Sequence, residues 1–332
     1  MLQGNLSLEN VDGAIKPWRL PHQRRALFPS PDDGLMLKAE MASGVRLRFS
    51  TNARRVTLEF DVLSGDPGGD RDSFFFDATV NNELVASLSV LPGQTSVVFA
   101  ELPKGDKIVD LWLPQEIPVT LRALRTRANE PCTEVDDPRP RWVTYGSSLT
   151  HCVRAHSPAR TWPAIVARRY GLSLTNLGFG GQCHLDAQIG FVIAEHSADL
   201  ISLKLGINCI GGSLSARTFP GAVLSLIRII RTRHPTTPIA LVSPIGYPPH
   251  ESQPNIVGYS IEAMRRDILD VRERLVDAGD ANLWYFDGVE IFDLSLIDRY
   301  AEDQCHPDGD GIEVMARNFD RTVMSQMMPL VS

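Results

Sequence analysis

The hydrophobic pattern changes near residue 130, and this change constrains the fold more than any other feature of the chain. Before it, apolar and polar residues alternate in short runs, as in 56–62 and 84–90. A period of two places the apolar side chains on one face of a strand. After it, continuous apolar runs alternate with longer segments of helical spacing. The 332 residues therefore divide into a β-rich part and an α/β part, in keeping with about 150 residues per domain.

The first part, 1–130, is expected to form an all-β sandwich of the jelly-roll kind. Turn sequences rich in Gly, Pro, Asp and Asn separate its alternating runs, at 64–69, 81–82, 92–93 and 103–106. Short strands with such breaks are typical of antiparallel sandwiches. The aromatic residues at 74–76 and Trp112 fit its core better than an exposed sugar platform. Segment 131–140 is polar and rich in proline, which predicts a linker.

The second part, 141–332, is expected to be an α/β/α domain with a parallel sheet. Continuous apolar runs predict strands at 142–145, 174–177, 200–205, 239–242 and 283–286. Helical spacing predicts helices at 161–170, 185–196, 219–233, 261–278 and 311–328. Strands that alternate with helices form parallel sheets buried on both faces. Ligands of such sheets bind at the carboxyl ends of the strands, so the residues that follow each strand are where chemistry is expected.

Composition argues against several classes of partner. The formal net charge is −7 without a basic patch or tail, so nucleic acid is not an expected partner. No apolar run approaches the ~20 residues of a membrane helix. The first residues lack a basic segment followed by an apolar one, so neither a membrane nor a signal peptide is expected. Five cysteines without disulfide-like spacing fit a reducing compartment, and we expect a cytoplasmic protein.

Polar clusters stand at the ends of three predicted strands and before the last helix. They read GSSLT at 146–150, NLGFGGQ at 176–182, GINC at 206–209 and DQCHP at 303–307. A parallel sheet would bring these clusters to one crevice. Acyl transfer needs a nucleophile, a base, an orienting acid and donors for an oxyanion. The clusters contain residues of each kind.

Individual residues can be given these roles. Ser148 lies on a tight strand-to-helix turn that would expose its hydroxyl. Asp303 and His306 are three residues apart, so the carboxylate can hold one imidazole nitrogen while the other faces the serine. The backbone N–H of Gly181 and the side-chain amide of Asn208 are expected to hold the oxyanion.

Several alternatives remain open from sequence. Ser147 is the nearest rival nucleophile, because the register of the turn is inferred. Asp308 and Asp310 are also acids near His306, but they are better placed to cap the last helix. Four cysteines flank the clusters, at 152, 183, 209 and 305. No Cys-x-x-Cys spacing supports zinc, so we expect these thiols to pack around the pocket and expect no metal.

Three further residues are candidate substrate contacts. His184 follows Gly181 by three residues, and a polar role at a helix start is equally plausible for it. Tyr247 and His250 lie in a proline-rich loop after the fourth predicted strand. Long loops at such positions are uncommon unless they are functional, so this loop is expected to form one rim of the site.

These motifs, in this order, resemble those of the SGNH hydrolases, also called the GDSL family. Gly146-Ser147-Ser148-Leu149 matches the family's Gly-Asp-Ser-Leu block, and Gly206-Ile207-Asn208 matches its Gly-x-Asn-Asp block. Gly181 matches the oxyanion glycine, and the pair 303 and 306 matches Asp-x-x-His. The resemblance covers 141 to the end of the chain and implies a flavodoxin-like α/β/α fold. Ser147 and Cys209 replace two family aspartates, which changes the polarity around the site without removing a catalytic group.

The resemblance implies serine-dependent acyl-ester chemistry through an acyl-enzyme, with no cofactor. Hydrolysis of a small acyl ester of a carbohydrate or glycoside is the first expectation, and the alternative is transfer of the acyl group to a hydroxyl of a natural product. A non-catalytic carbohydrate-binding protein is the least favoured class. The first part more loosely resembles the carbohydrate-binding-module-like sandwich of some two-domain bacterial esterases and acyltransferases. Because every catalytic group lies beyond 140, a small activated ester should need only residues 141–332.

Overall fold

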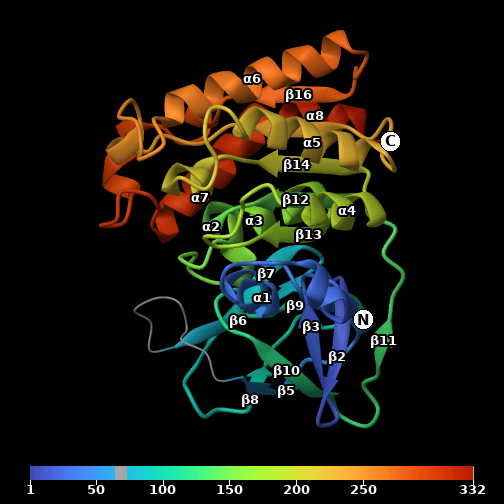
Figure 1. The fold of residues 1–332 in the computed structure, drawn as a ribbon. Coiled ribbons are helices and arrows are strands. Elements are labelled where there is room, and N and C mark those ends of the chain that lie inside the picture. The colour runs from blue at the N-terminus through green and yellow to red at the C-terminus, as the bar shows by residue number, and fades with distance from the viewer. Residues whose placement is uncertain (64–72, 332) are drawn as a thin grey trace. The chain divides into compact units, whose positions relative to one another are not determined.

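The structure, a computed structural model, describes residues 1–63 and 73–331, and the turn expected at 64–69 lies outside them. The chain divides into two compact units (Figure 1). The first unit is Met1–Arg139 with Ala155–Asn176, and the second is Pro140–Arg154 with Leu177–Ser332. The domain boundaries expected from sequence, 1–130 and 141–332, stay a prediction. Over the described residues, no helix combines the length and the apolar character that a membrane span requires.

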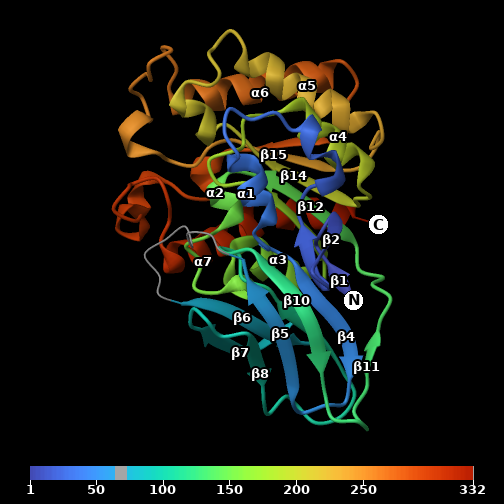
Figure 2. The ribbon, with the colours of Figure 1, turned by 60° about the horizontal axis from the view of Figure 1, so that its bottom comes forward.

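Two antiparallel sheets form most of the first unit, as the alternating pattern predicts. One has the order β1 (Leu2–Gln3), β4 (Arg46–Thr51), β9 (Lys107–Trp112), β6 (Phe74–Val80) and β7 (Glu83–Val90), with β11 (Cys132–Glu134) paired to β4. The other has the order β2 (Ser7–Val11), β3 (Ala14–Trp18), β10 (Val119–Arg125), β5 (Val56–Val62) and β8 (Ser96–Phe99). Figure 2 shows β5 and β10 side by side.

The core of the first unit consists of the inward side chains of these strands. In β5 every second residue from Val56 to Phe60 is buried. The ring of Phe60 lies 4.6 Å from that of Phe76 and 6.2 Å from that of Phe74. Full burial of one such side chain stabilises the fold by roughly 1.5–3 kcal/mol. Phe74, Phe76 and Trp112 are therefore core residues, and Phe75 is half-buried.

Some elements of the first unit are absent from the sequence prediction. The strands β1 to β3 precede the alternating region, and α1 (Gly34–Glu40) is a helix at its start. The segment GLMLKAE of α1 contains good helix formers, and only two of its residues are buried, so it carries little periodic signal. The short strand β11 lies within 131–140, the segment expected to be a linker.

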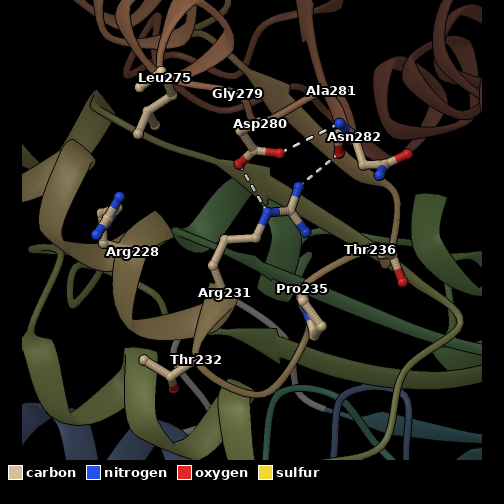
Figure 3. Close-up of a pocket in the computed structure, with 11 residues that line it drawn as sticks. Arg228, Arg231, Thr232, Pro235, Thr236, Leu275, Gly279, Asp280, Ala281 and Asn282 are labelled. Carbon is tan, nitrogen blue, oxygen red and sulfur yellow. Dashed lines mark hydrogen bonds and ion pairs between the residues drawn. The ribbon is translucent and has the colours of Figure 1, made fainter.

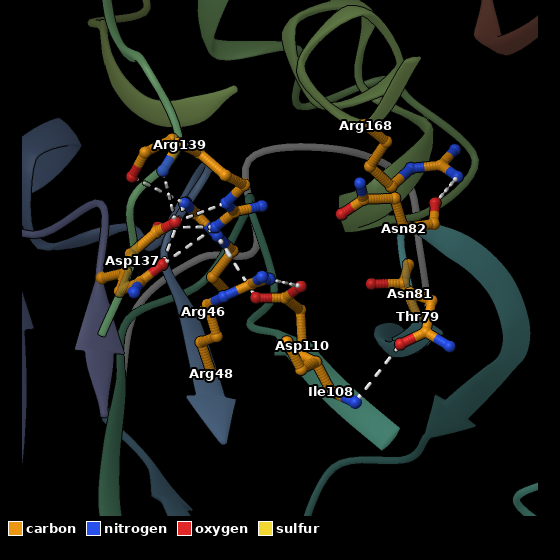
Figure 4. Close-up of polar contacts among 12 residues, drawn as sticks. Arg46, Arg48, Thr79, Asn81, Asn82, Ile108, Asp110, Asp137, Arg139 and Arg168 are labelled. Atoms are coloured by element: carbon orange, nitrogen blue, oxygen red, sulfur yellow. Dashed lines mark hydrogen bonds and ion pairs between the residues drawn. The ribbon is translucent and has the colours of Figure 1, made fainter. Parts of the chain in front are cut away.

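Buried arginines attach residues 155–176 to the sheets of the first unit. The side chains of Arg19 and Arg46 have no exposed surface. Arg19 donates from Nη1 to the carbonyl of Asn176 at 3.0 Å, and Arg46 donates from Nη1 to that of Leu174 at 3.0 Å. Figure 4 shows Arg46 and Arg48 converging on Asp110, with the Asp137–Arg139 pair beside them. The bonds from Arg19 and Arg46 satisfy the carbonyls of Asn176 and Leu174, which would otherwise be buried with one donor fewer.

Asp77 makes a second attachment to the same segment. Its Oδ2 accepts hydrogen bonds from Ser157 Oγ at 2.6 Å and from the Ala159 N–H at 2.7 Å. Burial raises the pKa of Asp77, while the hydrogen bonds from Ser157 and other donors oppose the rise. On the opposite side of the segment, Asn176 donates from Nδ2 to Ser43 Oγ at 2.9 Å.

A parallel sheet organises the second part of the chain, as predicted. Its order is β13 (Ser173–Gly178), β12 (Arg141–Gly146), β14 (Leu200–Lys204), β15 (Ile239–Val242) and β16 (Leu283–Phe286). The last residues of four strands lie in one row, because Gly146 pairs with Lys204, Lys204 with Val242, and Val242 with Phe286. The residues that follow these strands therefore leave the sheet at one edge.

Helices lie between and after the parallel strands, and all of them except the short α2 fall in segments whose spacing predicts a helix. They are α2 (Ser148–His151), α3 (Trp162–Tyr170), α4 (Ala187–Glu195), α5 (Phe219–Arg231), α6 (Ile261–Asp277), α7 (Gly309–Phe319) and α8 (Ser325–Met327). In α5 the buried residues recur every three or four positions, which is the amphipathic pattern of a helix on a sheet. The last predicted helix is interrupted after Phe319 by a π-helical turn, Asp320–Met324.

Candidate active site

The turn between β12 and α2 separates the roles of two adjacent serines. Ser147 is the N-cap of α2, its Oγ accepts the Leu149 N–H at 3.3 Å, and it is 1% exposed. A Cβ at Gly146 would lie 2.3 Å from Thr150 Oγ1, so the turn requires glycine there. Ser147 is thus used by the helix cap, and the hydroxyl of Ser148 is the one that reaches the neighbouring loop.

Ser148, His306 and Asp303 form one hydrogen-bonded chain. Ser148 Oγ lies 2.7 Å from His306 Nε2, and His306 Nδ1 lies 2.8 Å from Asp303 Oδ2. Asp303 Oδ1 accepts the N–H groups of Cys305 and His306 at 3.0 and 2.9 Å. Burial acts to raise the pKa of Asp303, but these hydrogen bonds and the imidazole lower it to about 2. An ionised carboxylate therefore faces an imidazole that touches a hydroxyl, the geometry needed to remove the hydroxyl proton.

The acids that follow His306 are used elsewhere. Asp308 is the N-cap of α7, and its Oδ1 accepts the Gly311 N–H at 2.6 Å. Asp310 forms an ion pair with Arg299 at 3.2 Å.

Arg154 is a residue of this site that sequence analysis missed. Its Nη2 lies 3.3 Å from Asp303 Oδ2, the oxygen that also faces the imidazole. The pair is partly exposed, with side chains 49% and 36% accessible. Arg154 lies in an irregular segment after α2, so no periodicity or motif marks it.

Gly181 and Asn208 lie on the loops that follow β13 and β14. Gly181 has a φ of +72°, which favours glycine, and a Cβ there would meet nothing within 4 Å. Asn208 Oδ1 accepts the Cys183 N–H at 2.9 Å. Because its oxygen is used in this way, the Nδ2 group of Asn208 remains as a hydrogen-bond donor.

The three candidate substrate contacts have protein partners. His184 bridges two loops, with Nε2 3.0 Å from the Gly181 carbonyl and Nδ1 2.8 Å from Ser213 Oγ. The rings of Tyr247 and His250 are 5.8 Å apart, beside a short 3-10 helix at Pro248–His250. Burial raises the pKa of Tyr247, and the charges of Cys305 and Asp303 add to the rise. Tyr247 therefore lies near the Asp303 segment. Contact of these residues with a substrate stays a prediction.

The cysteines near the site are free thiols. Burial raises the pKa of Cys209 to about 12 and that of Cys305 to about 11, and it raises the pKa of Cys183 further. Zinc binding and redox chemistry both require the thiolate, which this burial disfavours. In the part of the chain that the structure describes, no three His, Cys, Asp or Glu residues are grouped as a metal site would need.

Lys204 is a second feature that the motifs do not reveal. It ends β14 and is 3% exposed. Burial lowers the pKa of Lys204 to about 8, while the thiols of Cys183, Cys305 and Cys152 act in the opposite direction. A buried amino group with a lowered pKa thus ends the strand that precedes the loop of Asn208.

Two pockets of the second unit differ in position and character. One is narrow and reaches Ser148 and His306, with mostly apolar residues around it: Leu149, Cys152, Val153, Pro307, Ile312 and Met315. The other, shown in Figure 3, is larger, has both polar and apolar residues around it, and lies where the chain enters β15 and β16. Its Arg231 is held by Asp280 at 2.8 Å and by the Asn282 carbonyl at 2.7 Å. The second pocket is at the amino ends of the strands, away from the candidate catalytic residues.

Comparison with known families matches both parts of the chain. A family described as "GDSL-like Lipase/Acylhydrolase family" matches residues 140–324. A family described as "SsfX3, N-terminal domain" matches residues 1–122. A search of curated proteins finds no match.

Solved structures are similar over nearly the whole chain. The salicylyl-acyltransferase SsfX3 from a tetracycline biosynthetic pathway is 30% identical with a TM-score of 0.90, over 100% of this chain and 96% of that one. A putative GDSL-like lipase from Bacteroides ovatus is 17% identical with a TM-score of 0.77, over 99% and 96% of the two chains. A family two carbohydrate esterase from Clostridium thermocellum is 15% identical with a TM-score of 0.66, over 87% and 94%. The last two similarities show the fold alone.

Proposed function

The chain belongs to the GDSL-like lipase/acylhydrolase family, and from this premise we propose that Ser148, His306 and Asp303 are its catalytic triad. Membership makes it an enzyme of the esterase or acyltransferase type. The hydrogen-bonded chain from Ser148 Oγ to His306 and on to Asp303 supports the assignment of the three roles.

The proposed reaction has two halves. His306 Nε2 takes the proton of Ser148 as Oγ attacks the carbonyl carbon of an acyl donor. The N–H groups of Gly181 and Ser148 and the Asn208 amide hold the oxyanion that forms. The tetrahedral intermediate collapses, the leaving group takes the proton from His306, and the acyl group remains on Ser148. A second hydroxyl then gives its proton to His306 and attacks the acyl-enzyme. The bond from the acyl carbon to Ser148 Oγ breaks, Ser148 takes the proton back from His306, and the new ester is released.

We propose that the second hydroxyl belongs to a small-molecule acceptor, so that the enzyme is an acyltransferase. The observation that carries this choice is the similarity to the salicylyl-acyltransferase SsfX3, which extends over the whole chain and includes the N-terminal family. The apolar pocket beside Ser148 favours a donor whose acyl group is short or flat and largely hydrocarbon. The sequence alone favoured hydrolysis, and the full-length similarity moves the preference to transfer.

Hydrolysis of a small acyl ester is the second candidate. His306 is 28% exposed at the side chain, so water has access to the base that would activate it. Similarity of fold to a carbohydrate esterase is compatible with this candidate and does not identify a sugar substrate.

The test is the fate of the acyl group. The purified full chain is incubated with p-nitrophenyl esters of acetate and benzoate, and intact-protein and peptide mass spectrometry locate the acyl adduct. Phenolic and sugar hydroxyl acceptors are then added, and the products are separated. An adduct on Ser148 that passes to an acceptor faster than to water supports transfer. Partition to water alone, with every acceptor, supports hydrolysis, and turnover without an adduct on Ser148 in single-turnover experiments contradicts the nucleophile.

A further inference from the structure

We propose that His151 is a positioning residue that holds the loop carrying Gly181, the proposed oxyanion donor. The inference rests on the proposed function, because it assigns His151 a task in that reaction. Nothing in the motif pattern requires a histidine at this position, and the triad does not use it.

The loop from Gly178 to Cys183 is held by hydrogen bonds on either side of Gly181. The Phe179 N–H donates to the Gly146 carbonyl at 2.8 Å, and the Gly180 N–H donates to His151 Nδ1 at 3.3 Å. The Cys183 N–H donates to Asn208 Oδ1 at 2.9 Å. These acceptors come from three separate segments of the site.

Gly181 itself is not fixed by packing. It has a positive φ, and no atom lies within 4 Å of the place that a Cβ would occupy. The direction of its N–H is therefore set by hydrogen bonds: those of Gly180 and Cys183 on either side, and the contact of its own carbonyl with His184 Nε2 at 3.0 Å. The Gly181 N–H shares a peptide plane with the Cα and carbonyl of Gly180, and His151 holds the N–H of that same Gly180, so a shift of Gly180 moves the donor.

His151 also belongs to the helix that carries the proposed nucleophile. It is the last residue of α2, one turn after Ser148, and its side chain has no exposed surface. Its backbone N–H donates to the Ser147 carbonyl at 3.0 Å. A Cβ at Gly178 would lie 2.3 Å from the backbone nitrogen of His151, so α2 and the oxyanion loop touch at the main chain. One residue thus links the position of the nucleophile to that of the donor.

The bond requires a defined state of the imidazole. Nδ1 accepts a hydrogen bond only without a proton, so the neutral ring carries its proton on Nε2. Asparagine can place an acceptor oxygen near the position of Nδ1, whereas phenylalanine fills the volume of the ring without any acceptor. Comparison of the two substitutions therefore separates the effect of the hydrogen bond from the effect of side-chain packing.

The experiment compares His151→Phe with His151→Asn in the full chain. We expect His151→Phe to lower kcat for p-nitrophenyl acetate by about 10- to 100-fold, somewhat less than complete loss of an oxyanion donor. KM should change by less than about threefold, because the contact acts on the transition state. His151→Asn should recover most of the loss. The rate at which a p-nitrophenyl alkylphosphonate phosphonylates Ser148, with release of p-nitrophenolate, should fall in parallel, because its phosphoryl oxygen uses the same donors.

His234 offers a matched control. It is also buried, at 7% exposure, and its Nε2 lies 3.0 Å from the His196 carbonyl, away from the site. His234→Phe should lower thermal stability and leave kcat and the phosphonylation rate unchanged. If His151→Phe does not fold, the comparison of His151→Asn with His151→Gln tests the positioning role. A glutamine amide reaches the position of Nε2 and would not replace the acceptor at Nδ1, so only His151→Asn should keep activity.

The possible outcomes separate the positioning role of His151 from the proposed function. The positioning role would be overturned if folded His151→Phe keeps the wild-type kcat and phosphonylation rate. It would also be overturned if the asparagine, glutamine and phenylalanine variants lose activity equally. Ser148→Ala, measured alongside, separates the two proposals: if it keeps full activity, the proposed function fails, whatever the His151 variants do. If Ser148→Ala is inactive and His151→Phe is not impaired, only the inference about His151 fails.

Discussion

At the scale of single residues, the site depends on which polar atoms already have partners. Ser147 and Ser148 are chemically identical, but the Oγ of Ser147 accepts a cap hydrogen bond and that of Ser148 faces His306. In Asn208, similarly, the side-chain oxygen accepts the Cys183 N–H, and the Nδ2 group is the one that remains as a donor. Partners of this kind support the proposal that Ser148 and the Asn208 amide are the groups that act on a substrate.

The two serines should therefore respond differently to removal of the hydroxyl. Ser148→Ala should lower kcat on p-nitrophenyl acetate by at least roughly 10³-fold with the fold intact. Ser147→Ala should lower kcat by less than tenfold and lower stability by about 1 kcal/mol, since it removes a helix cap. Steady-state kinetics and urea unfolding of both variants measure this. Loss of activity in Ser147→Ala with activity kept in Ser148→Ala would place the nucleophile one residue earlier.

Lys204 should make stability depend on pH in a defined direction. Its pKa falls from 10.5 to about 8 in the folded chain because of burial. Between these values the unfolded chain binds a proton that the folded chain has released, so unfolding free energy rises with pH there. Lys204→Met should therefore be more stable than wild type at pH 7, by on the order of 3 kcal/mol, and the difference should shrink between pH 8 and 10.

Urea unfolding at pH 7 and pH 10 measures that difference. Lys104→Met, at an exposed lysine, is the control and should show no such change. A difference between Lys204→Met and wild type that stays constant from pH 7 to 10 would contradict the prediction.

At the scale of elements, the site is built from strand ends that lie in one row. Gly146, Lys204, Val242 and Phe286 are paired across neighbouring strands. The loops after β12 and β14 therefore start at the same edge, although their residues are more than fifty positions apart in sequence. The elements of the first unit are joined differently, through buried arginines that donate to main-chain carbonyls.

Arg19 should be important for the stability of the first unit. Its guanidinium donates to the carbonyls of Met41 at 2.6 Å and Asn176 at 3.0 Å, and burial lowers its pKa to about 9. Arg19→Met leaves these buried carbonyls with fewer donors, and we expect a loss of roughly 3–5 kcal/mol in unfolding free energy. Arg122→Met, which removes a half-exposed pair with Asp61, should have little effect. Chemical denaturation compares the two, and equal effects would contradict the proposed importance of burial.

At the scale of the whole molecule, residues 155–176 group with a part of the chain that is distant in sequence. They lie inside the GDSL-like family match, yet they cluster with the first unit. Hydrogen bonds donated by Arg19 and Arg46, and others accepted by Asp77 and the Asn82 carbonyl, contribute to this grouping. The first unit thus contains residues that belong to the family match of the second part of the chain.

A chain that begins at Arg141 should consequently fail to fold, in contrast to the expectation that residues 141–332 would suffice for a small ester. It would lack the donors for the Leu174 and Asn176 carbonyls and would expose α3, where Trp162 is buried. Circular dichroism and p-nitrophenyl acetate turnover measure the outcome. Co-expression with residues 1–139 as a separate fragment is the control, and it should restore the folded circular dichroism spectrum and the turnover of p-nitrophenyl acetate. A truncated chain that is folded and active by itself would contradict this prediction.

Periodicity and motif order by themselves determined the β-rich part, the parallel sheet with its five strands, and the membership of Ser148, Gly181, Asn208, Asp303 and His306 in one set of strand-end clusters. These features are local, since they follow from alternation, helical spacing and short motifs. The contacts of Arg154 and His151 and the burial of Lys204 were decided only by tertiary structure, because no motif marks these residues and their partners are distant in sequence. The same holds for the grouping of 155–176 with the first unit, since hydrogen bonds between buried side chains and remote carbonyls leave no periodic trace in the sequence.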